Sequence, residues 1–236
     1  LSLPKRITVR RTAPSVLDLP VNEPPEDPGA PPAASDLGPG FVAYSASGRV
    51  EGEVVYANYG LPADYAALLA RGVDVKGAVV LARYGRVHRA VKVASAQERG
   101  ARGILIYSDP ADDGFAKGEP LPKGPWRAAD LLQRGNAKLS WFFHGDPLTP
   151  GRAAVADASR LRPEEAPTLP RIPAAVLSWS AARPLLEHLA GAVPEGFQGG
   201  LDFPYGTGPG PARAVLDVEM DAGLKPIANV LGRLRG

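Results

Sequence analysis

The stretch that decides the fold is residues 78–107, AVVLARYGRVHRAVKVASAQERGARGILIY. It opens with an apolar run over 78–82 and closes with another over 103–107, and such unbroken runs are typical of strands buried on both faces. Between the runs, Val91 to Glu98 has the composition of a helix and is followed by Gly100. The order strand, helix, strand predicts two parallel strands joined by a right-handed crossover.

Further elements are predicted on both sides of this unit. Upstream, the pattern indicates strands at 7–10 and 53–57 and a helix over 61–71. Downstream, it indicates strands at 139–143 and 174–177, a serine-capped helix over Ser180–Leu189 and a half-exposed strand over 214–220. We therefore expect a mixed α/β fold, with a central mixed sheet, a parallel core, antiparallel edges at 139–143 and 214–220, and flanking helices. The proline-rich stretch over 20–40 is expected to be an extended connector.

Composition excludes several classes of function. The chain has no cysteine, which excludes disulfides, thiolate zinc sites and a cysteine nucleophile. Its formal net charge is only +2, without a dense run of basic residues, so nucleic acid is not an expected partner. No apolar run reaches the roughly 18 residues that a membrane helix needs. The start of the sequence has no signal-peptide core, so either the protein is cytosolic or its targeting segment lies outside this sequence.

Most of the polar residues have a plain structural interpretation. The histidines at 88, 144 and 188 are far apart and lack partners at ligand spacing, so a structural role is expected for each. No G-x-S-x-G elbow is present, and the glycines over 206–210 are interpreted as a turn because the string contains a proline. The acidic residues at 109, 112 and 113 follow a strand, where helix capping explains them.

One segment is a better candidate for binding. Residues 82–89, ARYGRVHR, follow the carboxyl end of a predicted parallel strand, where ligands gather in open α/β sheets. Four cationic or potentially cationic side chains leave that turn: Arg83, Arg86, His88 and Arg89. Arginine suits planar carboxylates, because a guanidinium can form paired hydrogen bonds with them. The plainer alternative is a solvated basic turn with a surface ion pair to Glu98 or Asp109.

Four stretches also resemble a known family. They are ARYGRVHRAVKVASAQERGARGILIYSDPAD at 82–112, LQRGNAKLS at 132–140, GDPLTPG at 145–151 and IANVLGRLRG at 227–236. Together they are similar to the protease-associated (apical) domain of the glutamate carboxypeptidase and transferrin receptor family, which belongs to the M28 type of zinc metallopeptidase. The similarity runs from about Pro24 to Gly236. In that family the domain is inserted into a zinc exopeptidase domain and forms one wall of its substrate cavity.

The resemblance implies roles for five residues of this sequence. Arg89 matches an arginine that grips the C-terminal carboxylate of the substrate, and Asn136 matches an asparagine of the same pocket. Thr149 matches a ligand of a structural calcium ion, and the backbone carbonyl at Arg152 matches a second ligand. These two ligands would be a partial set, since calcium takes 6–8 oxygens. His88 stands where the carboxypeptidases carry an aromatic residue, which puts a preference for a glutamate side chain in doubt.

The resemblance also implies a domain organisation. Residues 1–38 would be an extended segment at the edge of a peptidase domain, 39–223 the protease-associated domain, and 224–236 the first strand returning to the peptidase domain. The ligands of the paired zinc ions lie downstream of the segment that matches 227–236 in the catalytic members. The parent protein is therefore expected to be a zinc carboxypeptidase, while this chain is expected to be inactive alone.

Two functions remain open at this point. The first is substrate recognition for a secreted, periplasmic or cell-surface exopeptidase acting on small acidic peptides, with the peptidase domain of the same polypeptide as partner and a homodimer as the parent. The second is a non-catalytic, receptor-like binding module, because family members without zinc ligands act as receptors. Exposed tryptophans at 126 or 141 would serve such a module.

Overall fold

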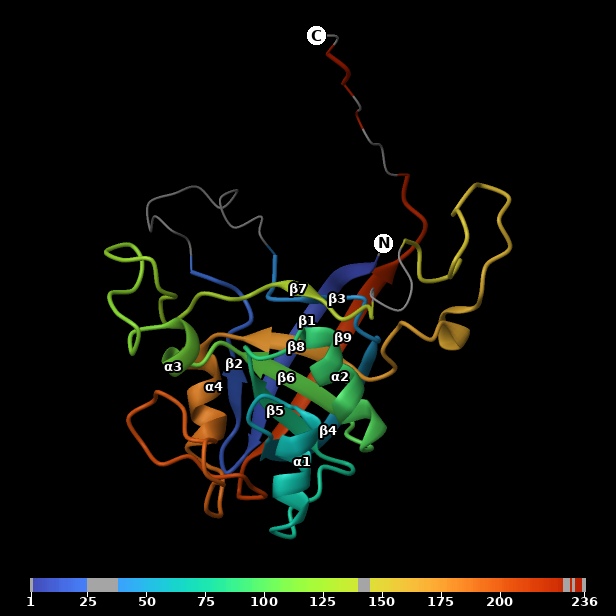
Figure 1. Ribbon diagram of the computed structural model, residues 1–236. Coiled ribbons are helices and arrows are strands. Elements are labelled where there is room, and N and C mark those ends of the chain that lie inside the picture. Colours follow the sequence, from blue (N-terminus) through green and yellow to red (C-terminus); the bar gives the residue numbers. More distant parts are fainter. Residues whose placement is uncertain (1, 25–37, 140–144, 227–229, 231, 235–236) are drawn as a thin grey trace.

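The computed structural model describes residues 2–24, 38–139, 145–226, 230 and 232–234 (Figure 1). Its main feature is a seven-stranded mixed sheet in the order β2-β1-β9-β4-β5-β6-β8. These strands are β1 (Ser2–Ala13), β2 (Leu17–Leu19), β4 (Gly48–Tyr56), β5 (Val79–Arg83), β6 (Gly103–Tyr107), β8 (Ala174–Leu177) and β9 (Arg213–Ala222). The helices are α1 (Pro62–Leu69), α2 (Arg89–Glu98), α3 (Pro110–Asp113) and α4 (Trp179–Leu186), with a short 3₁₀ turn, η2 (Pro163–Glu165). A second, small sheet pairs β3 (Val42–Ala43) with β7 (Gly135–Asn136).

The parallel half of the sheet forms as the sequence predicts. β5 and β6 pair in parallel, with Val79 opposite Gly103, and α2 connects them. β4 and β8 extend this parallel set on either side. Every residue of β5, β6 and β8 is buried, which explains why their sequences lack polar alternation.

The other half of the sheet is antiparallel. The sequence predicts an antiparallel edge at 214–220, which is wrong: β9 lies between β1 and β4, pairs antiparallel with both and is therefore an inner strand. The sequence predicts only residues 7–10 as the first strand, but β1 continues over 2–13, because it pairs with β9 along most of its length. Ile7 and Val9 are buried while Thr8 and Arg10 are exposed, so this half presents a polar face to solvent. The start of β1 and the end of β9 lie side by side, with Ser2 opposite Ala222.

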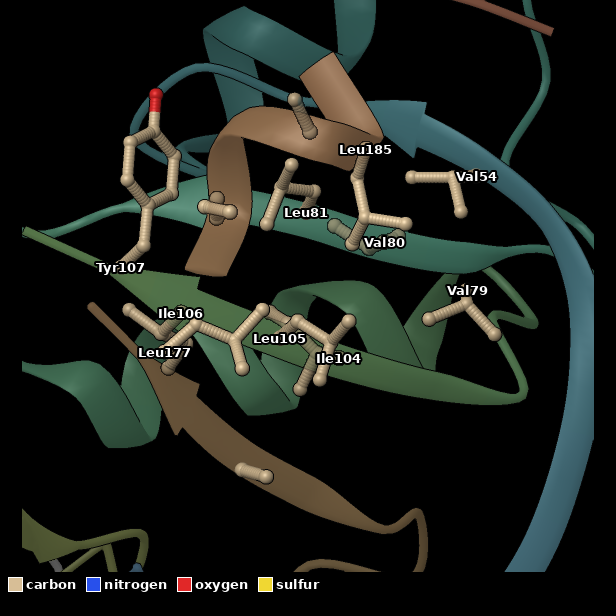
Figure 2. Packing of buried hydrophobic residues seen from close by; sticks show 14 of the residues in the cluster. Val54, Val79, Val80, Leu81, Ile104, Leu105, Ile106, Tyr107, Leu177 and Leu185 are labelled. Carbon is tan, nitrogen blue, oxygen red and sulfur yellow. The ribbon is translucent and has the colours of Figure 1, made fainter. Parts of the chain in front are cut away.

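One hydrophobic core joins the sheet to its helices. Figure 2 shows side chains from β4, β5, β6, β8 and α4 in a single cluster, among them Val54, Leu81, Leu105, Leu177 and Leu185. All five are at most 1% exposed. Burial of one such aliphatic side chain is worth about 1.5–3 kcal/mol. This core fixes the carboxyl ends of the parallel strands, where the candidate site lies.

Two sequence predictions need correction or fall outside the described chain. The last helix begins at Trp179 rather than Ser180, and Ser178 is its cap, because the Ser178 side chain accepts a hydrogen bond from the Ala181 amide at 3.2 Å. The Ser180 hydroxyl instead donates to Asp130. The strand predicted at 139–143 lies outside the described residues except for Leu139, which is in no strand.

Candidate functional site

The candidate site lies where β5 ends and the chain turns into α2. The turn has an unusual backbone, since Gly85 has a φ of +104° and Arg86 a φ of +65°. This left-handed region favours glycine and is rarely occupied by other residues. The next helix, α2, begins at Arg89 and has His88 as its N-cap. β7 packs against α2 and brings Asn136 to the same place.

Arg89 is half-buried and held from two sides. Its Nε donates a hydrogen bond to the Tyr84 hydroxyl at 3.2 Å, and that hydroxyl donates to the Gln133 carbonyl at 2.7 Å. Burial raises the pKa of Tyr84 to about 12, so the phenol keeps the proton that this second bond requires. On the other side the guanidinium lies directly against Gly135, where a Cβ atom would be 1.6 Å from Nη1. The arginine therefore depends on a tyrosine and on the lack of a side chain at 135.

Asn136 follows Gly135 and leaves hydrogen-bonding capacity unused. Its Oδ1 is buried and accepts no hydrogen bond from the described residues. Within the same part of the chain, the terminal nitrogens of Arg89 donate none either, since its one hydrogen bond uses Nε. A buried polar atom without a partner costs about 1–3 kcal/mol. The positive end of the α2 dipole lies next to the Arg89 charge, so the site favours an anion.

His88 is exposed and caps α2 through its ring. Its Nδ1 accepts a hydrogen bond from the Ala90 amide at 3.2 Å, so Nδ1 carries no proton and the neutral ring is protonated at Nε2. Burial of the ring, followed by the positive charge of Arg89, lowers the pKa of His88. Both effects favour the neutral form of the ring.

Of the four cationic side chains expected to leave the turn, Arg83 does not. It is only 4% exposed, its Nε donates to the Asn58 side chain at 2.8 Å, and its ion pair is with Asp112 at 3.4 Å. Arg83 therefore does not form the surface pair to Glu98 or Asp109 of the plainer alternative, because it points into the molecule at the end of a strand buried on both faces. Arg86 is exposed as expected, and its guanidinium lies 5.4 Å from the centre of the Tyr59 ring.

The proposed calcium ligands lie in a separate turn over 146–152. Thr149 is fully buried, its hydroxyl is 3.5 Å from an Asp146 carboxylate oxygen, and its carbonyl accepts the Arg152 amide at 3.0 Å. The Asp146 carboxylate also faces the Arg160 guanidinium at 3.7 Å. No cluster of three histidine or acidic side chains that could hold a metal ion exists in the described ranges. The Asp146 carboxylate and the two oxygens of Thr149 thus face other groups of this chain. They do not form a complete calcium site.

The remaining polar motifs are structural where the structure describes them. The glycines over 206–210 form a turn whose backbone packs on residues 188–190. Asp109 caps α3 and its carboxylate accepts four hydrogen bonds, two of them from Tyr107 and Tyr205. The ring of His188 contacts Arg11 at 3.1 Å. His144 and Trp141 lie outside the described residues.

The sequence did not single out Tyr84 and Gly135, which hold Arg89, or Lys92, a buried residue of α2 that donates a hydrogen bond to the Gly85 carbonyl at 2.9 Å. Tyr84 follows the last residue of β5, and a phenol there gave no signal of its role because its partner at Gln133 is 49 positions away. Gly135 resembles any other turn glycine until Arg89 is placed against it. Lys92 did carry a signal, since it shares the apolar face of α2 with Val93 and Ala96.

Comparison with known proteins supports the family resemblance. Residues 50–138 match the family model of the PA domain. The chain contains a protease-associated domain. It is 40% identical over 198 residues to transferrin receptor protein 2 of Homo sapiens and 37% identical over 211 residues to a glutamate carboxypeptidase 2 homolog of Caenorhabditis briggsae. Each match covers 83% of this chain, and respectively 24% and 27% of the relative.

The chain thus spans about a quarter of the length of these relatives. They differ in kind, since one is named a receptor and the other a carboxypeptidase. Among solved structures, an aminopeptidase from Aneurinibacillus sp. strain AM-1 is similar over 94% of this chain and 33% of its own, at 16% identity and a TM-score of 0.44. The helices in the described part of the chain are all too short or too polar to span a bilayer.

Proposed function

We propose that this chain is the protease-associated domain of a zinc-dependent exopeptidase, carboxypeptidase-like and acting on small acidic peptides. The domain would form a wall of the substrate cavity and anchor the C-terminal carboxylate of the substrate. One observation carries the proposal: Arg89, fixed by Tyr84 and Gly135, donates no hydrogen bond from its terminal nitrogens to any described residue, and it lies against the strand that carries Asn136.

In this proposal the described residues bind and orient the substrate. The Arg89 guanidinium pairs with both oxygens of the carboxylate, and the Asn136 amide supplies a neutral hydrogen-bonding partner beside it. His88 lies at the rim of this site and would contact the terminal side chain. Zinc bound by the peptidase domain would supply the activated hydroxide for hydrolysis. Fixing the carboxylate sets which peptide bond reaches that domain.

The test is a pair of variants in the full-length protein. Arg89→Ala is expected to lower kcat/KM for peptides with a free C-terminal carboxylate. The loss of transition-state stabilisation should be about 2–5 kcal/mol, the range for truncating one partner of a buried charge pair. C-terminally amidated peptides should be nearly unaffected. Arg86→Ala is the matched control, because Arg86 is an exposed arginine of the same turn. An equal loss on both substrate types would refute the anchoring role.

The proposed organisation places residues 1–38 and 224–236 at the junction with a peptidase domain, around a protease-associated domain over 39–223. Two features bear on it. β1 and β2 pair inside the sheet of this domain, and the paired ends of β1 and β9 meet at one end of that sheet. The described residues after 223 form no strand here, so their strand would form only against that partner. A secreted, periplasmic or cell-surface location and a homodimeric parent complete this proposal.

Calcium belongs to the same junction in this proposal. Thr149 and the Arg152 carbonyl would supply two of the 6–8 oxygens that calcium takes, and the other ligands would come from the peptidase domain. Addition of calcium should therefore leave the thermal stability of the 236-residue chain unchanged while stabilising the full-length protein.

A receptor-like binding module is the second candidate, favoured by the 40% identity to transferrin receptor protein 2. Trp126 is half-buried, which leaves part of its ring for a partner. The two candidates differ in one observable, because only an exopeptidase would bind zinc and release terminal residues in full-length form.

A further inference from the structure

Lys92 is a buried lysine next to the proposed anchoring site. It lies on α2, one turn after Arg89, and its side chain is 0% exposed. Its ammonium group donates hydrogen bonds to the carbonyl of Tyr59 at 2.5 Å and to the carbonyl of Gly85 at 2.9 Å. The first carbonyl belongs to the segment between β4 and α1, and the second to the turn that leads into α2. One side chain thus joins two loops at the carboxyl ends of neighbouring parallel strands.

The charges around Lys92 are engaged elsewhere. Asp64, on α1, accepts hydrogen bonds from the Asn58 side chain and the Leu61 amide. Asp112, on α3, accepts from the Tyr59 hydroxyl at 2.8 Å and pairs with Arg83. The Tyr59 ring lies 5.5 Å from the ammonium. The acids attract the ammonium from a distance, Arg83 of β5 repels it, and backbone carbonyls are its direct partners.

Burial of a lysine at this position costs more free energy than burial of an apolar side chain would. Burial lowers the pKa of Lys92 to about 8, because desolvation of the ammonium outweighs the attraction of Asp64 and Asp112. An apolar side chain of similar length would fill the same volume without that penalty. Proteins break such local rules mainly at sites where the residue does something besides packing.

The two bonded carbonyls indicate what the lysine does. The Gly85 carbonyl already accepts the Val87 amide at 2.7 Å, within the left-handed backbone of Gly85 and Arg86. Such backbone persists only where its surroundings hold it. Lys92 supplies a second bond to that carbonyl from inside the molecule, and Arg89 follows four residues later in the chain.

We propose that Lys92 is a positioning residue for Arg89: by joining the carbonyls of Gly85 and Tyr59 it holds the 84–88 turn in the shape that directs the Arg89 guanidinium to the ligand. This inference rests on the proposed carboxylate-anchoring function. Its structural half, the link from Lys92 to the turn, can be measured without any substrate.

The test compares Lys92→Met with Lys117→Met in the 236-residue chain, by NMR. Methionine keeps the length of the side chain and loses its hydrogen-bond donors, whereas Lys117 is exposed and serves as the matched control. We expect Lys92→Met to lower the hydrogen-exchange protection of the Val87 amide at least tenfold, relative to the protection of the Leu81 amide in β5. We also expect it to shift the Arg89 Cζ resonance, with no change in Lys117→Met. A folded Lys92→Met with both signals unchanged would overturn the proposal.

If Lys92→Met does not fold, titration of the wild-type chain decides. A change in the Arg89 Cζ resonance with a midpoint near pH 8 supports the link, since that is where Lys92 would lose its proton. A flat profile from pH 6 to 9.5 overturns it.

Kinetics of the full-length protein separate this inference from the proposed function. Lys92→Met should raise KM for the free-carboxylate peptide N-acetylalanylglutamate about ten- to a hundredfold. The KM for the same peptide with a C-terminal amide should stay unchanged. If Arg89→Ala discriminates between the two substrates and Lys92→Met does not, the positioning role fails while the function stands. If Arg89→Ala affects both substrates equally, the proposed anchoring function fails. The NMR experiment then decides by itself whether Lys92 holds the 84–88 turn.

Discussion

At the scale of single residues, the site depends on what surrounds Arg89 as much as on Arg89 itself. Nε of the arginine donates a hydrogen bond to Tyr84, and the guanidinium lies directly against Gly135. These contacts restrict the side chain before a ligand arrives, so less rotamer entropy is lost on binding. They explain how a half-buried arginine at the start of α2 would act as a specific anchor.

Gly135→Ala tests this arrangement by displacing the guanidinium. The three atoms nearest to the new Cβ all belong to the flexible Arg89 side chain, with Nη1 at 1.6 Å and Cζ at 2.1 Å. We expect the fold to adjust with a change of about 1 kcal/mol or less in the free energy of unfolding, while kcat/KM for free-carboxylate peptides falls at least tenfold. Gly223→Ala is the control, since a Cβ there meets open space. Unchanged kcat/KM in a folded Gly135→Ala would mean that Arg89 does not act from this position.

At the scale of elements, the start of α2 combines two functions in neighbouring residues. His88 ends the turn by capping the helix, and Arg89 begins the helix as the proposed anchor. A cation in the first turn of a helix is unfavourable, because the helix dipole is positive there. The cap offsets part of this cost only while Nδ1 of His88 is unprotonated.

The cap predicts a pH dependence of stability. The pKa of His88 in the folded chain is lowered from about 6.5, its ordinary value when unfolded, by burial and by Arg89. The unfolded chain therefore binds the proton first as pH falls, so this contribution is complete above about pH 6.5 and is lost below it. The free energy of unfolding is measured in urea between pH 7.5 and 5. His88→Asn should make it fall less steeply as the pH decreases, because asparagine caps a helix without titrating. Equal slopes in both proteins would contradict the capping role.

The elements that the sequence predicted well are those whose signal is local. The apolar runs of β5 and β6 and the helix between them needed no knowledge of the rest of the chain. β1 was underestimated because its partner, β9, lies some 200 positions away and supplies the pairing that extends it. The α4 cap was misplaced by two residues because Ser178 and Ser180 both precede the same apolar pattern.

The site was predictable only in part for the same reason. Arg89 and Asn136 were singled out by resemblance, and the structure brings their elements together through the contact of α2 with β7. Arg83 was misjudged, since a basic residue at the end of a buried strand can point inward when Asn58 and Asp112 receive it. Lys92 was missed although it lies on the apolar face of α2, because its partners are backbone carbonyls, which a sequence does not identify.

At the scale of the whole molecule, the chain contains a region over 50–138 that matches the PA domain, and its proposed role needs a peptidase domain beside it. The described residues form their own core and a seven-stranded sheet, with the ends of β1 and β9 meeting at one end. Its relatives are about four times as long as the part it matches. Arg89 and Asn136 would anchor a substrate for chemistry carried out elsewhere in the same polypeptide.

The intact mass of the native protein that carries this sequence, isolated from its own cells, shows whether a peptidase domain accompanies this chain. We expect a polypeptide several-fold heavier than the 24.7 kDa of this chain, with bound zinc in the additional part. A mature species near 24.7 kDa would contradict the account, because a domain that stands alone has no peptidase cavity to line, and the binding module would then replace the exopeptidase.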